Sequence, residues 1–401
     1  MVELVETPLR DLVSTGSTTG TPGAVEARRG RSPVVELAET APGRVGPASG
    51  SGDGSPTSTG EVCSEPAYTD WHVHIVQSSS SWPVRMRAVV YDRYGPPNVL
   101  RVEDIPIPMP GANQVLVEVA ATSVNLTDWE GLRGTPMYAR IGGLRSPARR
   151  VLGSDIAGRV AAVGSGVTRL HLGDEVYGDN LGLMGGFAEY AVAPESALAL
   201  KPKGLSFAQA STLPQAGSIA FQGTARVRRG QRVLINGAGG GAGSFATQLA
   251  VRAGAHVTCV DNAGKLDYLR TLGADEVVDF RRSDFTRLEP FDLVLDLVAH
   301  RSVLAYRRAL TRGGRYLFVG GSVRTLLRVV TVGAALGLLT GRRLGLLIAR
   351  QGPSHFVPVA DRVLAGDLRI HIDRTFPLDE VAQALAYVGE GRALGKVVVT
   401  P

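Results

Sequence analysis

The spacing of apolar residues changes abruptly at Met86. Upstream, Gly, Ser, Thr and Pro dominate, and apolar residues do not recur at strand or helix intervals. Such a segment buries too little apolar surface to offset the entropy lost on ordering. We therefore expect residues 1–85 to form a disordered extension. Since a strand pattern begins at Met86, we hypothesise that the native protein starts there.

Short strands separated by turns are predicted over residues 86–208. Residues 114–120 alternate apolar and polar side chains, as in a half-buried strand, and glycines punctuate residues 153–164. Two further apolar runs continue this pattern at 176–177 and 187–192. This succession is typical of an antiparallel, barrel-like domain.

Strands and helices alternate over residues 209–346, which predicts a doubly wound parallel sheet. The expected strands lie at 232–237, 256–261, 276–280, 291–298 and 314–320. The expected helices lie between the first two strands, at 265–272 and at 303–310. Gly254 and Gly273 stand where helix C-caps belong. Residues 347–401 include an amphipathic helix at 377–387 and a final strand at 395–400.

The first strand of this sheet runs into a glycine-rich turn. The strict G-x-G-x-x-G spacing is absent, but the relaxed form A-x-G-x-x-G fits Ala238, Gly240 and Gly243. The first two would let the backbone turn and approach a pyrophosphate, and the third would let helix and strand pack closely. The helix that follows offers free N–H groups to phosphates. The expected cofactor-binding residues here are Gly237, Ala238, Gly240, Gly241, Ala242 and Gly243.

The end of the second strand bears on which dinucleotide is bound. Asp261 lies 18 residues beyond Gly243, close to the position of an acid that binds ribose hydroxyls. A carboxylate there repels a 2′-phosphate and favours NADH. A shift of one residue brings Asn262 to this position, with Lys265 able to meet a phosphate. NADPH and NADH therefore both stay open as cofactors.

Composition narrows the class of protein. The chain has two cysteines, Cys63 and Cys259, so it can build neither a disulfide framework nor a four-cysteine zinc site. We therefore expect a cytoplasmic protein. The net charge is +6, and the positive excess lies downstream of residue 85, which suits an anionic ligand. No basic cluster is interleaved with aromatic residues, so we expect no nucleic-acid partner.

An apolar segment covers residues 326–348. Its longest uncharged run, residues 329–341, is too short to span a bilayer. We expect helices that pack on the sheet or at a dimer interface. A weak peripheral membrane contact, with arginines at the headgroups, is the alternative.

Several motifs resemble the medium-chain dehydrogenase/reductase superfamily, in particular its zinc-free quinone oxidoreductase (zeta-crystallin-like) branch. They occur in family order: N-x-x-D at 125–128, VLGSDIAG at 151–158, GDEV at 173–176, GFAEY at 186–190, the glycine-rich turn, LGAD at 272–275 and GKVVV at 395–399. The resemblance covers residues 86–401. It implies an α/β fold in which a Rossmann domain, residues 209–346, is inserted into a GroES-like β-barrel domain, residues 86–208 and 347–401. The cofactor and substrate would lie in the cleft between the two.

The resemblance also implies further site residues. Asn125 has a family counterpart near the nicotinamide, although an asparagine here can equally stabilise a turn. Tyr138 lies near the position where related enoyl thioester reductases carry a proton-donating tyrosine, and is otherwise a loop aromatic. Asp128 would hold the loop through side-chain-to-backbone bonds. We also expect Gly320, at the end of a predicted strand, and Lys396, in the closing motif, at the cofactor.

The function expected from these features needs no metal. A catalytic zinc in this superfamily requires thiolate and imidazole ligands, and no cysteine lies between Cys63 and Cys259. We expect an NAD(P)H-dependent, zinc-independent oxidoreductase that passes hydride to a quinone, an enone or another activated double bond. The alternatives are an alcohol dehydrogenase-type or enoyl-thioester reductase activity and a non-catalytic dinucleotide-binding or membrane-peripheral protein. The expected partners are a small-molecule substrate and a second copy, bound through the Rossmann sheet.

Overall fold

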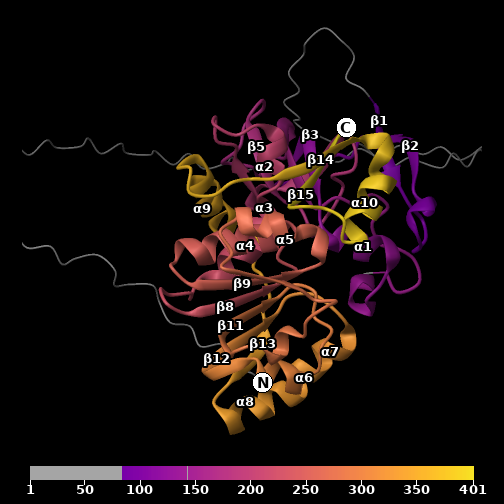
Figure 1. The fold of residues 1–401 in the computed structure, drawn as a ribbon. Helices are drawn as coiled ribbons and strands as arrows, with labels where there is room; N and C mark the ends of the chain where they lie inside the picture. The colour runs from indigo at the N-terminus through magenta and orange to yellow at the C-terminus, as the bar shows by residue number, and fades with distance from the viewer. Residues whose placement is uncertain (1–83, 142) are drawn as a thin grey trace, which may run out of the picture. The chain divides into compact units, whose positions relative to one another are not determined.

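The computed structural model describes residues 84–141 and 143–401, which Figure 1 shows as a ribbon. The expected disordered extension and the hypothesis of a native start at Met86 concern residues that lie almost wholly outside this part. The first strand, β1 (Arg85–Val90), pairs antiparallel with β2 (Arg101–Pro106) in a separate two-stranded sheet.

A seven-stranded sheet forms the barrel-like domain. Its order is β14-β15-β3-β4-β5-β7, and β6 pairs with β3. The strands are β3 (Gln114–Val124), β4 (Asp155–Val163), β5 (Glu175–Asp179), β6 (Tyr190–Pro194), β7 (Leu198–Leu200), β14 (Ile372–Pro377) and β15 (Lys396–Thr400). All pairs are antiparallel except β14–β15, which is parallel. The last strand of the chain therefore lies inside a sheet that the first half of the chain builds.

A six-stranded parallel sheet confirms the predicted Rossmann fold. Its order is β10-β9-β8-β11-β12-β13. The strands are β8 (Arg232–Asn236), β9 (His256–Asp261), β10 (Glu276–Asp279), β11 (Phe291–Asp296), β12 (Leu310–Phe318) and β13 (Arg343–Leu346). The first five correspond to the predicted strands, and β12 begins earlier than predicted. Strand order reverses between β8 and β11, which in such sheets is where a ligand crevice opens.

The helices connect these strands and cover the sheets (Figure 1). The α-helices outside the apolar segment are α1 (Leu126–Arg133), α2 (Phe207–Ser211), α3 (Pro214–Thr224), α4 (Gly241–Arg252), α5 (Leu266–Thr271), α6 (Val303–Arg308), α9 (Pro353–Leu364) and α10 (Val381–Gly389). Short 3-10 turns occur at Pro97–Val99, Met137–Arg140, Glu195–Ala197, Ala263–Lys265, Phe285–Arg287 and Leu378–Glu380. α4, α5, α6 and α10 correspond to predicted helices. Gly254 and Gly273 follow α4 and α5 with positive φ, as expected of C-cap glycines.

The apolar segment 326–348 differs from the prediction of helices alone. It begins within α7 (Val323–Arg328) and continues through a π-helix (Val329–Gly333) and α8 (Ala334–Thr340), but near its end it forms β13. This strand extends the sheet in parallel beside β12. Periodicity alone cannot distinguish a four-residue strand from part of an apolar helix. No helix in the described part of the chain is long and apolar enough to cross a bilayer.

Hydrogen bonds join the barrel sheet to the glycine-rich turn and to helix α3. The N–H of Gly395, directly before β15, donates to the carbonyl of Gly239 at 2.9 Å. The N–H of Gln215, at the start of α3, donates to Asp155 Oδ1 on β4 at 2.9 Å. Residues from both sheets therefore meet at the carboxyl ends of β8 and β9, and the site forms there.

Candidate active site

A pocket of about 560 Å³ lies where the two sheets meet. Barrel residues line one side of it, and the glycine-rich turn and the ends of the Rossmann strands line the other. Eleven of the thirteen residues expected at the site line it: Asn125, Tyr138, Gly237, Gly240, Gly241, Ala242, Asp261, Asn262, Lys265, Gly320 and Lys396. The other two, Ala238 and Gly243, are buried beneath the turn and do not line it.

The glycine-rich turn has the geometry of a phosphate cradle. Gly237 has a φ of 82°, and Gly240 is the N-cap of the 12-residue helix α4. A Cβ on Gly243 would lie 2.4 Å from the carbonyl oxygen of Gly237, so only glycine lets the helix pack this closely. A Cβ on Gly240 would meet nothing nearer than 3.6 Å and would occupy pocket space. The turn therefore fits a dinucleotide pyrophosphate at a helix N-terminus.

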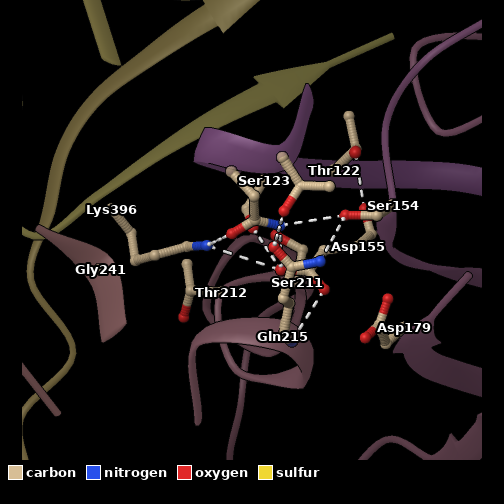
Figure 2. Close-up of polar contacts among 12 residues, drawn as sticks. Thr122, Ser123, Ser154, Asp155, Asp179, Ser211, Thr212, Gln215, Gly241 and Lys396 are labelled. Atoms are coloured by element: carbon tan, nitrogen blue, oxygen red, sulfur yellow. Dashed lines mark hydrogen bonds and ion pairs between the residues drawn. The ribbon is translucent and has the colours of Figure 1, made fainter. Parts of the chain in front are cut away.

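Lys396 reaches the pocket floor from β15. Its stem passes so close to Gly241 that a Cβ there would lie 2.5 Å from Lys396 Cδ. The Nζ donates to Asn125 Oδ1 at 2.6 Å and lies 3.5 Å from Asp155 Oδ2 (Figure 2). Only 2% of Lys396 is exposed. A positive charge is thus buried beside the N-terminus of α4.

Asp155 is the carboxylate that compensates this charge. It also accepts hydrogen bonds from Ser123 Oγ at 2.9 Å, Asn125 Nδ2 at 2.8 Å and the N–H of Gln215. Burial raises the pKa of Asp155, whereas Lys396 and the hydrogen-bond donors lower it. Burial lowers the pKa of Lys396, and Asp155 most strongly opposes that shift. We assign the charged pair, because donors surround the carboxylate.

Asn125 is both a helix cap and part of this network. Its amide Nδ2 donates to Asp155 Oδ2 and, at 3.2 Å, to Ser154 Oγ, while its Oδ1 accepts from Lys396. Asp128, three residues later, accepts from the N–H of Asn125 at 2.8 Å and that of Gly153 at 3.1 Å. Asp128 thus holds the loop as expected. The buried side chains of Ser154, Asp155 and Lys396 hold the amide of Asn125 in place, so Asn125 fixes the shape of the pocket floor.

Tyr138 and Glu130 form a second pair on the pocket wall. The Tyr138 hydroxyl lies 3.3 Å from Glu130 Oε1 and 3.2 Å from the carbonyl oxygen of Gly321. Burial raises the pKa of Glu130 to about 7 and that of Tyr138 to about 12. A protonated Glu130 can donate to Tyr138 while Tyr138 donates to Gly321. The pair can therefore hold a proton at neutral pH.

Asp261 and Lys265 lie side by side at the end of β9 and line the pocket. Asp261 Oδ2 accepts from the N–H of Gly239 at 2.8 Å, and its Oδ1 accepts from the N–H of Asn262. The Nζ of Lys265 lies 3.7 Å from Asp261 Oδ1, and both side chains are almost fully buried. Asn262 is itself the cap of the following turn, because its Oδ1 accepts from the N–H of Gly264. The negative charge of Asp261 and the positive charge of Lys265, which have opposite effects on a 2′-phosphate, therefore lie in the same part of the pocket.

Among the contributors to the site that the sequence did not indicate as site residues are Thr127, Glu130, Asp155 and Gln215. Thr127 Oγ1 bonds Gln215 Oε1 at 3.1 Å across the junction of the two sheets. Asp155 stands within the VLGSDIAG motif, which was the available signal for it. Glu130 had none, because a glutamate in a short helix is ordinarily solvent-exposed. In the described residues, no group of three or more His, Cys, Asp and Glu side chains could hold a metal ion.

Comparisons with known proteins agree with this architecture. The family model "Alcohol dehydrogenase GroES-like domain" matches residues 111–203, and "Zinc-binding dehydrogenase" matches residues 272–399. The 2-methylene-furan-3-one reductase of Solanum lycopersicum is 33% identical over 339 residues, covering 81% of each chain. The chloroplastic NADPH-dependent alkenal/one oxidoreductase of Arabidopsis thaliana is 32% identical over 341 residues, covering 81% of this chain and 82% of its own.

A solved structure shows the same relationship. The quinone oxidoreductase from Coxiella burnetii superposes with a TM-score of 0.72 at 31% sequence identity, covering 79% of this chain and 99% of its own. Sequence identity, fold and the order of motifs thus agree over the Rossmann and GroES-like parts. The chain belongs to the medium-chain dehydrogenase/reductase superfamily, in its quinone oxidoreductase branch.

Proposed function

We propose that this protein is an NAD(P)H-dependent, zinc-independent oxidoreductase that reduces quinones, enones or related activated double bonds. The observation that carries the proposal is the pocket in which the glycine-rich turn and the buried Lys396 lie together. Relatives named as alkenal/one and quinone oxidoreductases support it. Zinc independence is supported by the residue types at the floor, where Lys396, Asn125 and Asp155 supply ammonium, amide and carboxylate groups. The imidazole of His300 also lines the pocket, but among the described residues no group of three or more His, Cys, Asp and Glu side chains could hold a metal ion.

The residues of the pocket divide the work of the reaction. The first turn of α4 and the glycines before it would hold the pyrophosphate, and the apolar side chains of Val124, Leu126 and Ile219 line the reaction chamber and limit water. A bound reduced nicotinamide supplies the hydride. Lys396 contributes a fixed positive charge, which favours negative charge that develops on a substrate oxygen.

The pair of Tyr138 and Glu130 favours enones as substrates. Hydride addition to the β-carbon of an enone moves the π electrons to the carbonyl oxygen, and the resulting enolate needs a proton. The Tyr138 hydroxyl would give its proton to the enolate, and the Glu130 carboxyl would return one to Tyr138. Quinone reduction yields a stabilised hydroquinone anion, which solvent can protonate.

We expect Tyr138→Phe to lower kcat for enones roughly 100-fold and to change kcat for quinones by less than about threefold. The measurement is the loss of NAD(P)H absorbance with a panel of quinones, enones and enoyl thioesters. Because the relay needs protonated Glu130, enone turnover should fall as pH rises through about 7, and Glu130→Gln should flatten that profile. Equal losses on both substrate classes would refute the donor role. Cofactor binding without turnover on the whole panel would refute the proposed function.

We also propose that the pocket accepts NADH and NADPH alike. The carboxylate of Asp261 repels a 2′-phosphate and the ammonium of Lys265 attracts it, and the two charges lie 3.7 Å apart. Asp261→Asn keeps an oxygen for the N–H of Gly239 but removes the charge. It should raise the ratio of kcat/KM for NADPH over NADH about tenfold. Lys265→Met should lower the ratio. An unchanged ratio in Asp261→Asn would remove this residue from the ribose site.

The proposed quaternary structure is a homodimer formed through the Rossmann sheet. The edge strand β13 supports it, because one side of this strand pairs with β12 and a second copy can pair with the other. A monomeric mass by light scattering would contradict it.

A peripheral membrane contact is supported by exposed Leu327 and Leu339 near arginines. The cytoplasmic location is proposed from cysteine usage, and imaging of a tagged protein would test it.

A further inference from the structure

A second cavity, of about 820 Å³, opens at the amino ends of the Rossmann strands. Its lining comes from residues 225–231 before β8, from the starts of β11 and β12, and from the first residue of β13. The active-site pocket gathers at the carboxyl ends of the same strands. Because the strands are parallel, the two cavities lie at opposite ends of the strands. The proposed oxidoreductase function does not use this second cavity.

Arginines dominate the lining of this cavity. They are Arg226, Arg228, Arg312, Arg315 and Arg343. The single carboxylate in the lining, Asp292, already accepts hydrogen bonds from the N–H of Arg232 and from Thr311 Oγ1, both at 2.9 Å. Among the residues that the structure describes, no carboxylate oxygen lies within 4.0 Å of a nitrogen of any of these five guanidinium groups, so none of the five forms an ion pair. The cavity therefore holds a surplus of positive charge.

Arg315 shows the cost of this arrangement most clearly. It is half-buried on β12. Burial has the largest effect and lowers the pKa of Arg315, and the positive charges of Arg226 and Arg343 lower it further. A guanidinium that is partly desolvated and surrounded by like charges destabilises the folded protein unless an anion joins it.

The surrounding chain does not neutralise this charge. Residues 297–360 contain ten arginines and not one aspartate or glutamate. This stretch supplies α6, β12, α7, α8 and β13. A surface segment with one sign of charge raises the local concentration of counter-ions and steers them toward a cavity. The arginine cavity is thus part of a larger cationic region.

The end of α8 adjoins the cavity. The N–H of Gly313 donates to the carbonyl of Gly341 at 2.8 Å, and Gly341 caps α8. Leu339, two residues before this cap, is 83% exposed. An apolar side chain therefore projects from the helix that ends beside the arginines. A phospholipid would meet both features, whereas a soluble phosphate would need the arginines alone.

We propose that the arginine cavity binds a phosphate-bearing anion through Arg312, Arg315 and Arg343. Guanidinium forks suit the geometry of phosphate oxygens and form paired, charge-assisted hydrogen bonds with them. The phosphate belongs either to a soluble compound with two or more negative charges or to a phospholipid headgroup. The experiment separates these two sources.

The first measurement is calorimetric titration of the full-length protein with inorganic pyrophosphate in the presence of saturating NADPH, which occupies the glycine-rich turn. The double variant Arg312→Gln/Arg343→Gln should bind at least tenfold more weakly than wild type. The matched control is Arg308→Gln, an exposed arginine on α6 outside the cavity, and should bind within twofold of wild type. Both cavity arginines are exposed, so the double variant should keep the wild-type thermal unfolding temperature or exceed it. Should it unfold, the single variant Arg343→Gln replaces it.

The second measurement is co-sedimentation with phosphatidylcholine vesicles, with and without phosphatidylglycerol. A lipid source predicts sedimentation with the anionic vesicles only, weakened by Leu339→Ser and by the double variant. A soluble source predicts pyrophosphate binding without sedimentation. The proposal is overturned if the double variant binds both probes as well as wild type does, or if wild type binds neither probe.

Discussion

The variant Lys396→Met should lose about 3–5 kcal/mol of unfolding free energy, because it leaves Asp155 as a buried charge without its partner. Methionine preserves the length of the stem beside Gly241, so the loss reports the charge and not the packing. Urea unfolding followed by circular dichroism measures the effect. The same variant should also lose activity, since the ammonium of Lys396 orients Asn125 at the pocket floor.

Two controls isolate the ion pair. The double variant Lys396→Met/Asp155→Asn carries neither charge and should regain at least about 1 kcal/mol relative to Lys396→Met alone. Lys203→Met removes an exposed lysine and should change stability by less than about 0.5 kcal/mol. If the two substitutions at the pair add without coupling, the charged-pair assignment is wrong.

Gly243→Ala should mainly lower stability, whereas Gly240→Ala should mainly weaken cofactor binding. Gly243→Ala should lower the unfolding free energy by about 3 kcal/mol, because its Cβ would lie within 2.6 Å of the backbone of Gly237 and Ala238. Gly240→Ala has ordinary φ and ψ angles and no close contact, so it should cost at most about 1 kcal/mol. Its methyl group should nevertheless weaken NADPH binding at least tenfold, since it fills space that a pyrophosphate needs.

Fluorescence titration with NADPH and thermal unfolding together check this pair. The expected pattern is a protein that binds poorly but folds normally for Gly240→Ala, and a protein that folds poorly for Gly243→Ala. A Gly240→Ala variant with wild-type affinity would show that the phosphate lies elsewhere. A Gly243→Ala variant of wild-type stability would show that α4 can move away from β8 at little cost.

Local patterns in the sequence predicted most of the fold. Five strands of the parallel sheet and the helices between them were readable, because side chains that face a core recur at the period of the element that carries them. Gly254 and Gly273 marked helix ends, because a left-handed cap favours glycine. The strand β13 was missed. It has four residues, and Gly345 interrupts its apolar run.

The site could be predicted only in part. The glycine-rich turn is continuous in sequence, so its residues and its position between strand and helix could be predicted before the structure. The contacts of Lys396 were not, because it bonds a residue 271 positions away. The pair Glu130 and Tyr138 likewise depends on how α1 and the 3-10 turn after it are arranged against Gly321.

The sequence by itself predicted the two sheets, the position of the glycine-rich turn and the family. Tertiary structure alone decided the chemistry of the pocket floor. The reason is one register: β15 enters the barrel sheet beside β3 with Val397 opposite Val124, which brings Lys396 next to Asn125 and Asp155. Periodicity reflects the local free energy of each element, whereas a buried ion pair exists only once distant strands have been brought together.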